Sequence, residues 1–214
     1  MSCITPPPGA LTRKRYLLRF AQDAADLRAV QRLRFEVFNL ELGEGLDSAY
    51  ALGRDEDVYD DACHHLMVIE RDAGVVGTYR MQTAAIARAG RGFYAATEFD
   101  LSPLQADVLE QGVEVGRACI AAEHRSGRVL SLLWQGLAHY MSWQQKRYLF
   151  GCCSVPAISK AVGRDLFQAL QGREGLFSPH TVRPLPDLDC RMADDLTDDL
   201  AEDVTPLAPL PPQF

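Results

Sequence analysis

The segment from residue 113 to residue 145 constrains the fold more than any other part of this chain. Val113–Ala121 is almost entirely apolar, as in a strand that is buried on both faces of a sheet. A short turn leads from it into Gly127–Gln145, where apolar residues recur at helical spacing. The main stripe of that helix consists of Val129, Leu133, Leu137 and Met141. A buried strand that runs into an amphipathic helix predicts an α/β protein with helices layered on a sheet.

The segments before this unit predict further strands and one long helix. Arg15–Phe20 predicts a first strand, and a helix follows it that is capped by Asp23 and continues to about Leu42. His65–Glu70 and Val75–Met81 flank an Asp-Ala-Gly turn and predict a hairpin. The remaining predicted elements are a strand at Phe93–Phe99, a short helix opened by Ser102-Pro103, a strand at Arg147–Cys152 and a helix at Ala157–Leu170.

The length of 214 residues predicts a single domain with tails. Residues 1–14, with Pro6-Pro7-Pro8-Gly9, are expected to form a flexible leader, and residues 15–183 the domain. Residues 184–214 hold eight acidic residues, one basic residue and six prolines, which predicts an irregular tail.

The charge of the chain argues against a nucleic-acid-binding protein. The net charge is −7, all of it in the tail, because residues 1–183 hold 21 acidic and 21 basic residues. Proteins that bind nucleic acids need a basic surface that displaces counterions from phosphates. No apolar run approaches the roughly 18–20 residues that span a bilayer, so any membrane contact is expected to be peripheral, at the inner face of the membrane.

The six cysteines predict neither disulfides nor a metal site. They form no C-x-x-C pair and no secretory signal precedes them, so a reduced, cytoplasmic protein is the simplest interpretation. Cys63-His64-His65 lacks a second cluster that could complete a metal site, so we expect no metal. Cys152 lies in an apolar strand and is better explained as a packed thiol than as a nucleophile.

Three groups of polar residues are candidates for chemistry. Glu114 and Arg117 interrupt an apolar strand, where an unpaired charge is costly, so we expect them to pair or to face a cleft. A bulge near Gly116 is one way to bring them together. The loop from Gly43 to Asp61 holds seven acidic residues, which form either a solvated run or a site for a cationic amine. The turn into the helix at Gly127 is either a plain turn or a phosphate site.

These groups occur in the order of one known family. The four segments are Arg34-Phe35-Glu36-Val37-Phe38, Asp57-Val58-Tyr59-Asp60, Gly77-Thr78-Tyr79-Arg80 and Glu114-Val115-Gly116-Arg117. In this order they resemble the acyl-homoserine-lactone-synthase-like branch of the GNAT acyltransferase superfamily. Segments around Cys63–Val68, Gly92–Leu101, Leu132–Gly136 and Tyr148–Cys152 are more similar to its relatives, the L-ornithine Nα-acyltransferases of ornithine lipid synthesis, often labelled hemolysin-like.

The resemblance implies a GNAT fold, a mixed central sheet with a V-shaped splay between helices, and an N-acyltransferase with no tightly bound cofactor. The donor would be a (3-hydroxy)acyl chain on acyl carrier protein, and the acceptor an amino acid. The α-amino group of ornithine is the first choice, while glycine, lysine and glutamine stay open. Alternatives are acyl-homoserine lactone synthesis from S-adenosylmethionine and a non-catalytic module that binds acyl carrier protein.

The resemblance also implies roles for particular residues. Glu114 would be the general base, with Arg117 orienting it or gripping the acceptor carboxylate. Asp57 and Asp60 would hold the cationic groups of the acceptor, and Arg34 and Arg80 would organise the acidic loop or the acceptor carboxylate. Phe38 would wall the acyl channel. The phosphopantetheine phosphate would bind at Arg125, Gly127, Arg128 and Val129.

One position departs from the usual GNAT pattern. Val129 stands where these proteins have a small residue, which leaves less room for a coenzyme A pyrophosphate. This departure favours a carrier-protein donor, whose phosphopantetheine has one phosphate.

Overall fold

The computed structural model describes residues 7–154, 159–171, 173 and 181–189. A six-stranded sheet forms the centre, and its strands lie in the order β1-β2-β3-β4-β6-β7. Every neighbouring pair is antiparallel except β6 and β7, which are parallel. The strands are β1 (Ala10–Arg13), β2 (Tyr16–Phe20), β3 (His64–Glu70), β4 (Gly74–Thr83), β6 (Gly112–Ile120) and β7 (Tyr148–Phe150). A separate ribbon pairs β5 (Phe99–Asp100) with β8 (Arg183–Pro184).

Helices cover both faces of the sheet. On one face lies α1 (Ala24–Arg34), which continues directly into a π-helix at Phe35–Glu41, and on the other lies α5 (Arg128–Gln144). Asp23 caps α1, because its carboxylate accepts hydrogen bonds from the backbone N–H groups of Ala25 and Asp26. The remaining helices are α2 (Ala49–Leu52), α3 (Ala84–Ala89), α4 (Ala106–Glu110) and α6 (Lys160–Gln171).

The main core lies between the sheet and α5. Leu66 and Val68 of β3 and Leu133 and Leu137 of α5 are almost fully buried there. Two glycines allow the close approach: a Cβ at Gly77 would lie 2.6 Å from Val129 Cγ1, and one at Gly136 would lie 2.4 Å from Leu66 Cδ2. A smaller cluster of Leu33, Val37 and Cys119 packs α1 on the opposite face.

The sheet opens on one side of β6. Only Gly112, Val113 and Glu114 pair with β7, at Tyr148, Leu149 and Phe150. Beyond Glu114 the two parallel strands are not paired in the described residues, which gives the predicted V-shaped splay. On its other side, β6 pairs with β4 through a bulge, because two residues of β6 stand opposite one of β4 between the pairs Arg80–Gly116 and Thr78–Cys119. Arg117 lies in this bulge in the left-handed region, with φ 47°.

The structure confirms most of the predicted elements and corrects two. Residues 10–13 are not part of a flexible leader but form β1, because a two-residue turn at Lys14-Arg15 folds them back onto β2. Phe93–Phe99 is not a strand: Tyr94–Thr97 is a 3-10 turn, because the N–H groups of Tyr94 and Ala95 bind the carboxylate of Glu114 instead of a neighbouring strand. Residues 157–158 and 190–214, parts of the predicted last helix and tail, lie outside the described residues.

Candidate active site

Six charged side chains form a chain of alternating sign beside the splay. In order they are Asp57, Arg80, Asp60, Arg34, Asp55 and Arg117. The arginines come from β4, α1 and β6, and the three aspartates from the acidic loop. The loop is therefore tied to the sheet and is not a solvated run.

The middle of this charge chain is buried and its two ends reach the surface. Arg34 and Asp55 have fully buried side chains, and that of Asp60 is 2% exposed. At the ends, the side chain of Asp57 is 18% exposed and that of Arg117 is 23% exposed. A buried charge is stable only when it is paired and hydrogen-bonded, so the buried middle residues neutralise one another. Only the two end residues are accessible to a ligand.

Asp60 is the best-connected member of the chain. Arg34 donates two hydrogen bonds to it, at 2.8 and 2.9 Å, Arg80 donates one at 2.9 Å, and the Gln31 side-chain amide donates another at 2.9 Å. Burial alone raises the pKa of Asp60, but the nearby positive charges, Arg34 first, more than reverse this effect and hold that pKa well below its usual range. Asp60 is thus a permanent anion without a free face for a substrate amine.

Glu114 and Arg117 do not contact each other. The carboxylate of Glu114 accepts hydrogen bonds from Gln82 Nε2 at 2.5 Å, from Tyr94 N at 2.9 Å and from Ala95 N at 2.6 Å. Arg117 instead donates to Asp55, and its guanidinium lies 4.6 Å from the centre of the Phe38 ring. Glu114 therefore holds the Tyr94–Thr97 turn, and Arg117 closes the charge chain.

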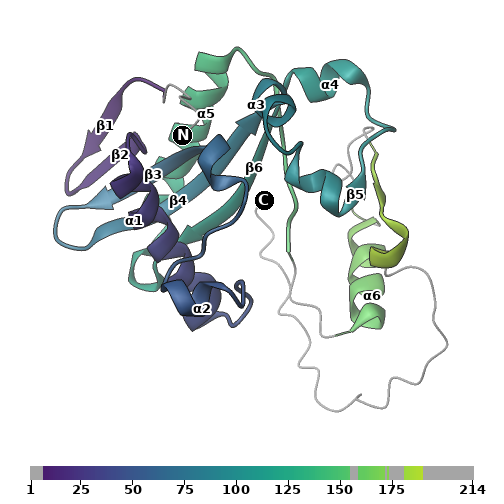
Figure 1. Ribbon diagram of the computed structural model, residues 1–214, viewed down its shortest axis with the longest axis horizontal. Helices are drawn as coiled ribbons and strands as arrows, with labels where there is room; N and C mark the ends of the chain where they lie inside the picture. Colours follow the sequence, from purple (N-terminus) through teal and green to yellow (C-terminus); the bar gives the residue numbers. More distant parts are fainter. Residues whose placement is uncertain (1–6, 155–158, 172, 174–180, 190–214) are drawn as a thin grey trace.

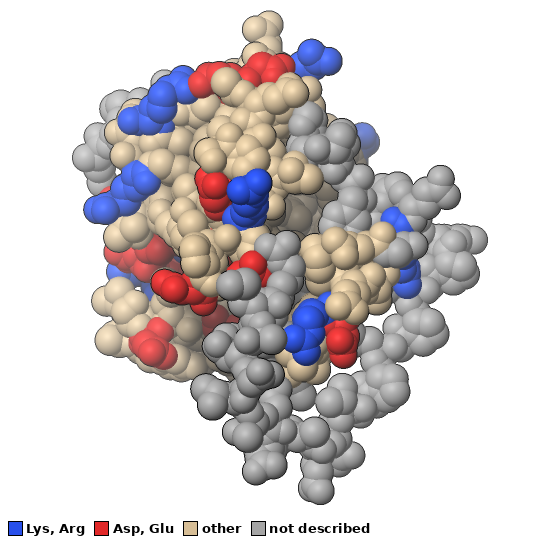
Figure 2. Space-filling model, turned by 90° about the vertical axis from the view of Figure 1, so that its right-hand side faces the viewer, with Lys and Arg blue, Asp and Glu red and all other residues tan. Residues whose placement is uncertain are grey.

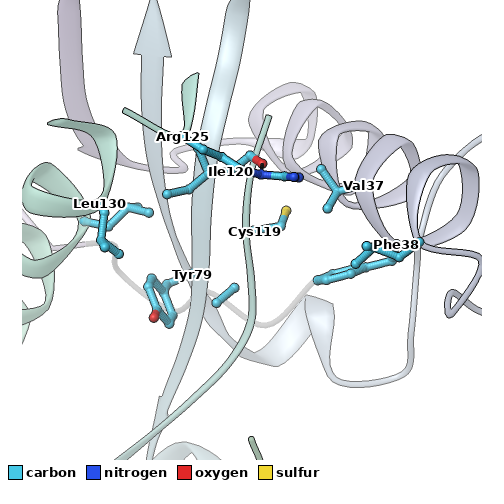
Figure 3. Close-up of a pocket in the computed structure, with 10 residues that line it drawn as sticks. Val37, Phe38, Tyr79, Cys119, Ile120, Arg125 and Leu130 are labelled. Carbon is cyan, nitrogen blue, oxygen red and sulfur yellow. Dashed lines mark hydrogen bonds between the residues drawn. The ribbon is translucent and has the colours of Figure 1, made fainter. Parts of the chain in front are cut away.

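An apolar cavity of about 310 Å³ opens along the free edge of β6. Val37 and Phe38 line it from the π-helix, Leu130 from α5, and Cys119 and Ile120 from the strand between them (Figure 3). Phe38 belongs both to this cavity and to the ring contact with Arg117. The positive end of the charge chain thus lies next to an apolar hollow in the splay.

The turn before α5 separates the four predicted phosphate-binding residues. Arg125 lines the cavity but forms a double hydrogen bond with Glu41, at 2.5 and 2.7 Å. Gly127, with φ 80°, leads into the helix, while Arg128 points into a different hollow. Val129 is fully buried against Gly77, so its side chain does not narrow the space in front of the turn. The position of Val129 therefore gives no support to a carrier-protein donor, which stays a prediction.

Sequence reasoning missed three residues that build the site. Asp55 joins Arg34 to Arg117. The side-chain amides of Gln31 and Gln82 donate hydrogen bonds to Asp60 and Glu114, respectively. The sequence did not distinguish Asp55 from the acidic residues around it, and its position two residues before Asp57 was only a weak indication that it belongs to the site. Cys152 lies after the end of β7 and is half-buried, so it is not a residue of an apolar strand as predicted. Burial, with Glu98 nearby, raises its pKa to about 12, which disfavours the thiolate that a nucleophile needs.

His65 makes the stability of this region depend on pH. It is 4% exposed, Asp60 O lies 3.0 Å from its Nε2, and burial lowers its pKa to about 4. The unfolded chain binds a proton near pH 6.5, so the stabilisation is complete above pH 6.5 and is lost as the pH falls toward 4. The free energy of unfolding should fall by about 3 kcal/mol more in the unchanged chain than in the His65→Gln variant between pH 7 and pH 4.5, as measured by urea unfolding. An equal pH dependence in both proteins would contradict the assignment.

Basic and acidic side chains are interspersed over the face seen in Figure 2, in keeping with their equal numbers in residues 1–183. In the part of the chain that the structure describes, no three His, Cys, Asp or Glu side chains are grouped so that they could hold a metal ion. No helix among those residues is long and apolar enough to cross a membrane.

Comparison with known proteins identifies the fold. Residues 33–135, from the end of α1 to the middle of α5, match the family model described as acetyltransferase (GNAT) domain. This part of the chain is therefore similar to a GNAT domain. The matched residues include β3, β4, the bulged strand β6 and the turn into α5, while β1, β2 and β7 lie outside the match. The mixed sheet between helices agrees with the GNAT fold that the sequence predicted.

Curated proteins named L-ornithine N(alpha)-acyltransferase are also similar to this chain. The one from Rhodobacter capsulatus is 38% identical over 149 residues, which cover 65% of this chain and 56% of that protein. The one from Brucella abortus is 36% identical over 152 residues, covering 65% and 54%. The one from Agrobacterium fabrum is 34% identical over 148 residues, covering 65% and 50%. The chain thus spans about half the length of the curated relatives it matches.

Among solved structures, the AHL synthase LasI superimposes on 72% of this chain and 78% of its own, with a TM-score of 0.46 and 16% identity.

Proposed function

We propose that this chain transfers an acyl group from a thioester to the α-amino group of L-ornithine. The observation that carries the proposal is the identity of 34–38%, over 148–152 residues, to proteins named for that reaction. The donor is a (3-hydroxy)acyl chain on acyl carrier protein, and the product is a lyso-ornithine lipid. The reaction takes place in the cytoplasm, with peripheral contact at the membrane face that receives the product.

The acceptor binds across the two exposed ends of the charge chain. An amino acid presents a carboxylate and ammonium groups, and the chain ends in a cation, Arg117, and an anion, Asp57. The Nε and Nη2 atoms of Arg117 bind Asp55, while its Nη1 makes no hydrogen bond within the described residues, so that atom is free for the acceptor carboxylate. The buried residues Arg34, Arg80 and Asp60 fix both ends in place.

The thioester lies in the splay, with its apolar part in the cavity walled by Phe38. In the reaction the neutral amine attacks the thioester carbonyl, the C–N bond forms, the C–S bond breaks and the pantetheine thiol leaves with a proton. The ammonium must first lose a proton to a base. Glu114 is our candidate, acting through a water molecule because three N–H groups already occupy its carboxylate.

The experiment that tests this function offers the purified chain 3-hydroxyacyl carrier protein with L-ornithine and follows thiol release and the acylated product by mass spectrometry. Glycine, lysine, glutamine and S-adenosylmethionine are tested in parallel. We expect Nα-acylornithine as the main product. Thiol release without any acylated amino acid, or a lactone from S-adenosylmethionine, would refute the proposal.

Glu114 has a structural task that its replacement exposes. In the Glu114→Gln variant an NH₂ group meets N–H donors, so at least one buried hydrogen bond is lost and the free energy of unfolding falls by about 1–3 kcal/mol. If Glu114 is also the base, turnover drops further at saturating ornithine, and part of this loss recovers at high pH, where the ornithine amine loses its proton without the base. Full turnover in a destabilised variant would leave it the positioning role alone. Glu110→Gln, in an exposed ion pair, is the control.

A further inference from the structure

A second hollow lies on the other side of α5 and is lined by cations. It has a volume of about 340 Å³ and lies between the β1–β2 turn and the first turns of α5. Its lining residues are Arg13, Lys14, Arg128, Ser131, Leu132 and Gln135. All of them are exposed except Leu132, which forms a buried apolar floor.

The charges of this groove lack compensation inside the protein. No acidic residue lines it, and none of Arg13, Lys14 and Arg128 forms an ion pair within the described residues. Pairing varies among the other exposed arginines: Arg88 pairs with Glu110 and Arg125 with Glu41, while Arg28 and Arg32 form no ion pair within the described residues. Three like charges around one hollow repel each other unless an anionic partner enters it.

Lys14 occupies a backbone conformation that normally belongs to glycine. It is the first of the two residues of the β1–β2 turn and has φ 56°, in the left-handed region. Hairpin turns that need a positive φ at this place usually have glycine there, because a side chain costs free energy. A lysine held in this conformation puts a cation at the rim of the groove despite that cost.

The groove and the thioester cavity flank the same helix turns. Leu130 and Leu133 of α5 line the cavity, while Arg128 and Ser131 line the groove. A partner seated in the groove therefore lies about one helix diameter, roughly 10 Å, from the cavity.

We propose that this groove docks an acidic helix of the acyl carrier protein, so that its phosphopantetheine arm passes the start of α5 into the splay. This inference rests on the proposed function, because it concerns the partner that delivers the thioester. The cations match an acidic surface, and the concave shape with a buried floor matches a helix better than it matches the flat surface of a membrane. Such contacts govern the association rate and its salt dependence.

The test measures binding of acyl carrier protein to the chain at two salt concentrations. We expect the double variant Arg13→Glu, Lys14→Glu to lose at least about tenfold in affinity and most of its salt dependence. Arg28→Glu, an exposed cation on α1 at the other face of the sheet, is the matched control and should bind like the unchanged chain. Lys14→Gly should weaken binding while the melting temperature stays equal or rises, because the turn is relieved of strain.

Turnover separates docking from chemistry. The double variant should lose kcat/KM with acyl carrier protein as donor and keep it with a short acyl-cysteamine thioester, which needs no docking. Equal carrier affinity in the unchanged chain and the double variant would overturn the inference, as would no binding at all. The inference would also be overturned if the double variant no longer bound phosphatidylglycerol vesicles but still bound the carrier protein like the unchanged chain. If the groove binds the carrier but ornithine is not acylated, the acceptor proposal fails and the docking inference stands.

Discussion

The Asp60→Asn variant should lose about 3–5 kcal/mol of stability, a large part of what holds a domain of this size together. The substitution keeps the shape of the side chain and removes its charge, so the buried guanidinium groups of Arg34 and Arg80 lose a shared counterion. It also turns one acceptor into a donor that faces other donors. Urea unfolding at pH 7 measures the effect.

Asp61→Asn is the matched control for this prediction. Asp61 is the next residue in the chain and is exposed, so its charge contributes little, and we expect a change below about 0.5 kcal/mol. The pH adds a second check. Because the folded-state pKa of Asp60 is lowered, its contribution is present above about pH 4 and is lost as the pH falls further. The two proteins should therefore converge in acid, and a constant difference down to pH 2 would argue against an electrostatic cause.

The Arg117→Gln variant should lose 100-fold or more in kcat/KM for L-ornithine, equivalent to about 3 kcal/mol. Glutamine removes the cation that we assign to the acceptor carboxylate. The measurement that isolates this role compares ornithine with 1,4-diaminobutane, which has the two amines and lacks the carboxylate. The unchanged enzyme should prefer ornithine strongly, and the variant should lose most of that preference.

A merely structural role for Arg117 gives a different pattern. The guanidinium also neutralises Asp55, so the variant loses some stability, and both acceptors would then lose activity by the same factor. An unchanged ratio between the two acceptors would remove Arg117 from the acceptor site. Arg32→Gln, an exposed arginine of α1, shows the effect of losing a distant positive charge.

Local chemistry made much of the fold predictable. Asp23 at the start of α1 and the Asp-Ala-Gly turn between β3 and β4 are short-range signals, and the structure follows both. The 3-10 turn at Tyr94–Thr97 was not predictable in this way. Its apolar, β-prone residues favour a strand, but a carboxylate twenty residues away takes two of its backbone N–H groups. Residues 10–13 follow three prolines and a glycine, which favour an irregular leader, and a strand of four residues is too short to give a clear pattern of its own.

The candidate site was predictable in its members and not in its pairings. The motifs pointed to Arg34, Asp57, Asp60, Arg80 and Arg117, and the structure gathers all five in one network. The spacing of Glu114 and Arg117 suggested a pair, yet each binds a different partner, because side-chain partners depend on the loop that packs over the strand. Asp55 could not be told from the acidic residues around it without knowing which of them the loop turns inward.

The burial gradient along the charge chain bears on how acceptor preference could change in descendants of this protein. Residues in the middle constrain one another so tightly that replacing one demands a matching replacement of its neighbour. The two solvent-facing ends each have a charged partner on one side only, Arg80 for Asp57 and Asp55 for Arg117, so they are less constrained. For the acceptor site that we propose, new amino-acid preferences should therefore arise by single substitutions at positions 57 and 117. Directed evolution that randomises only those two positions should sample them at a smaller cost in stability than changes in the middle of the charge chain.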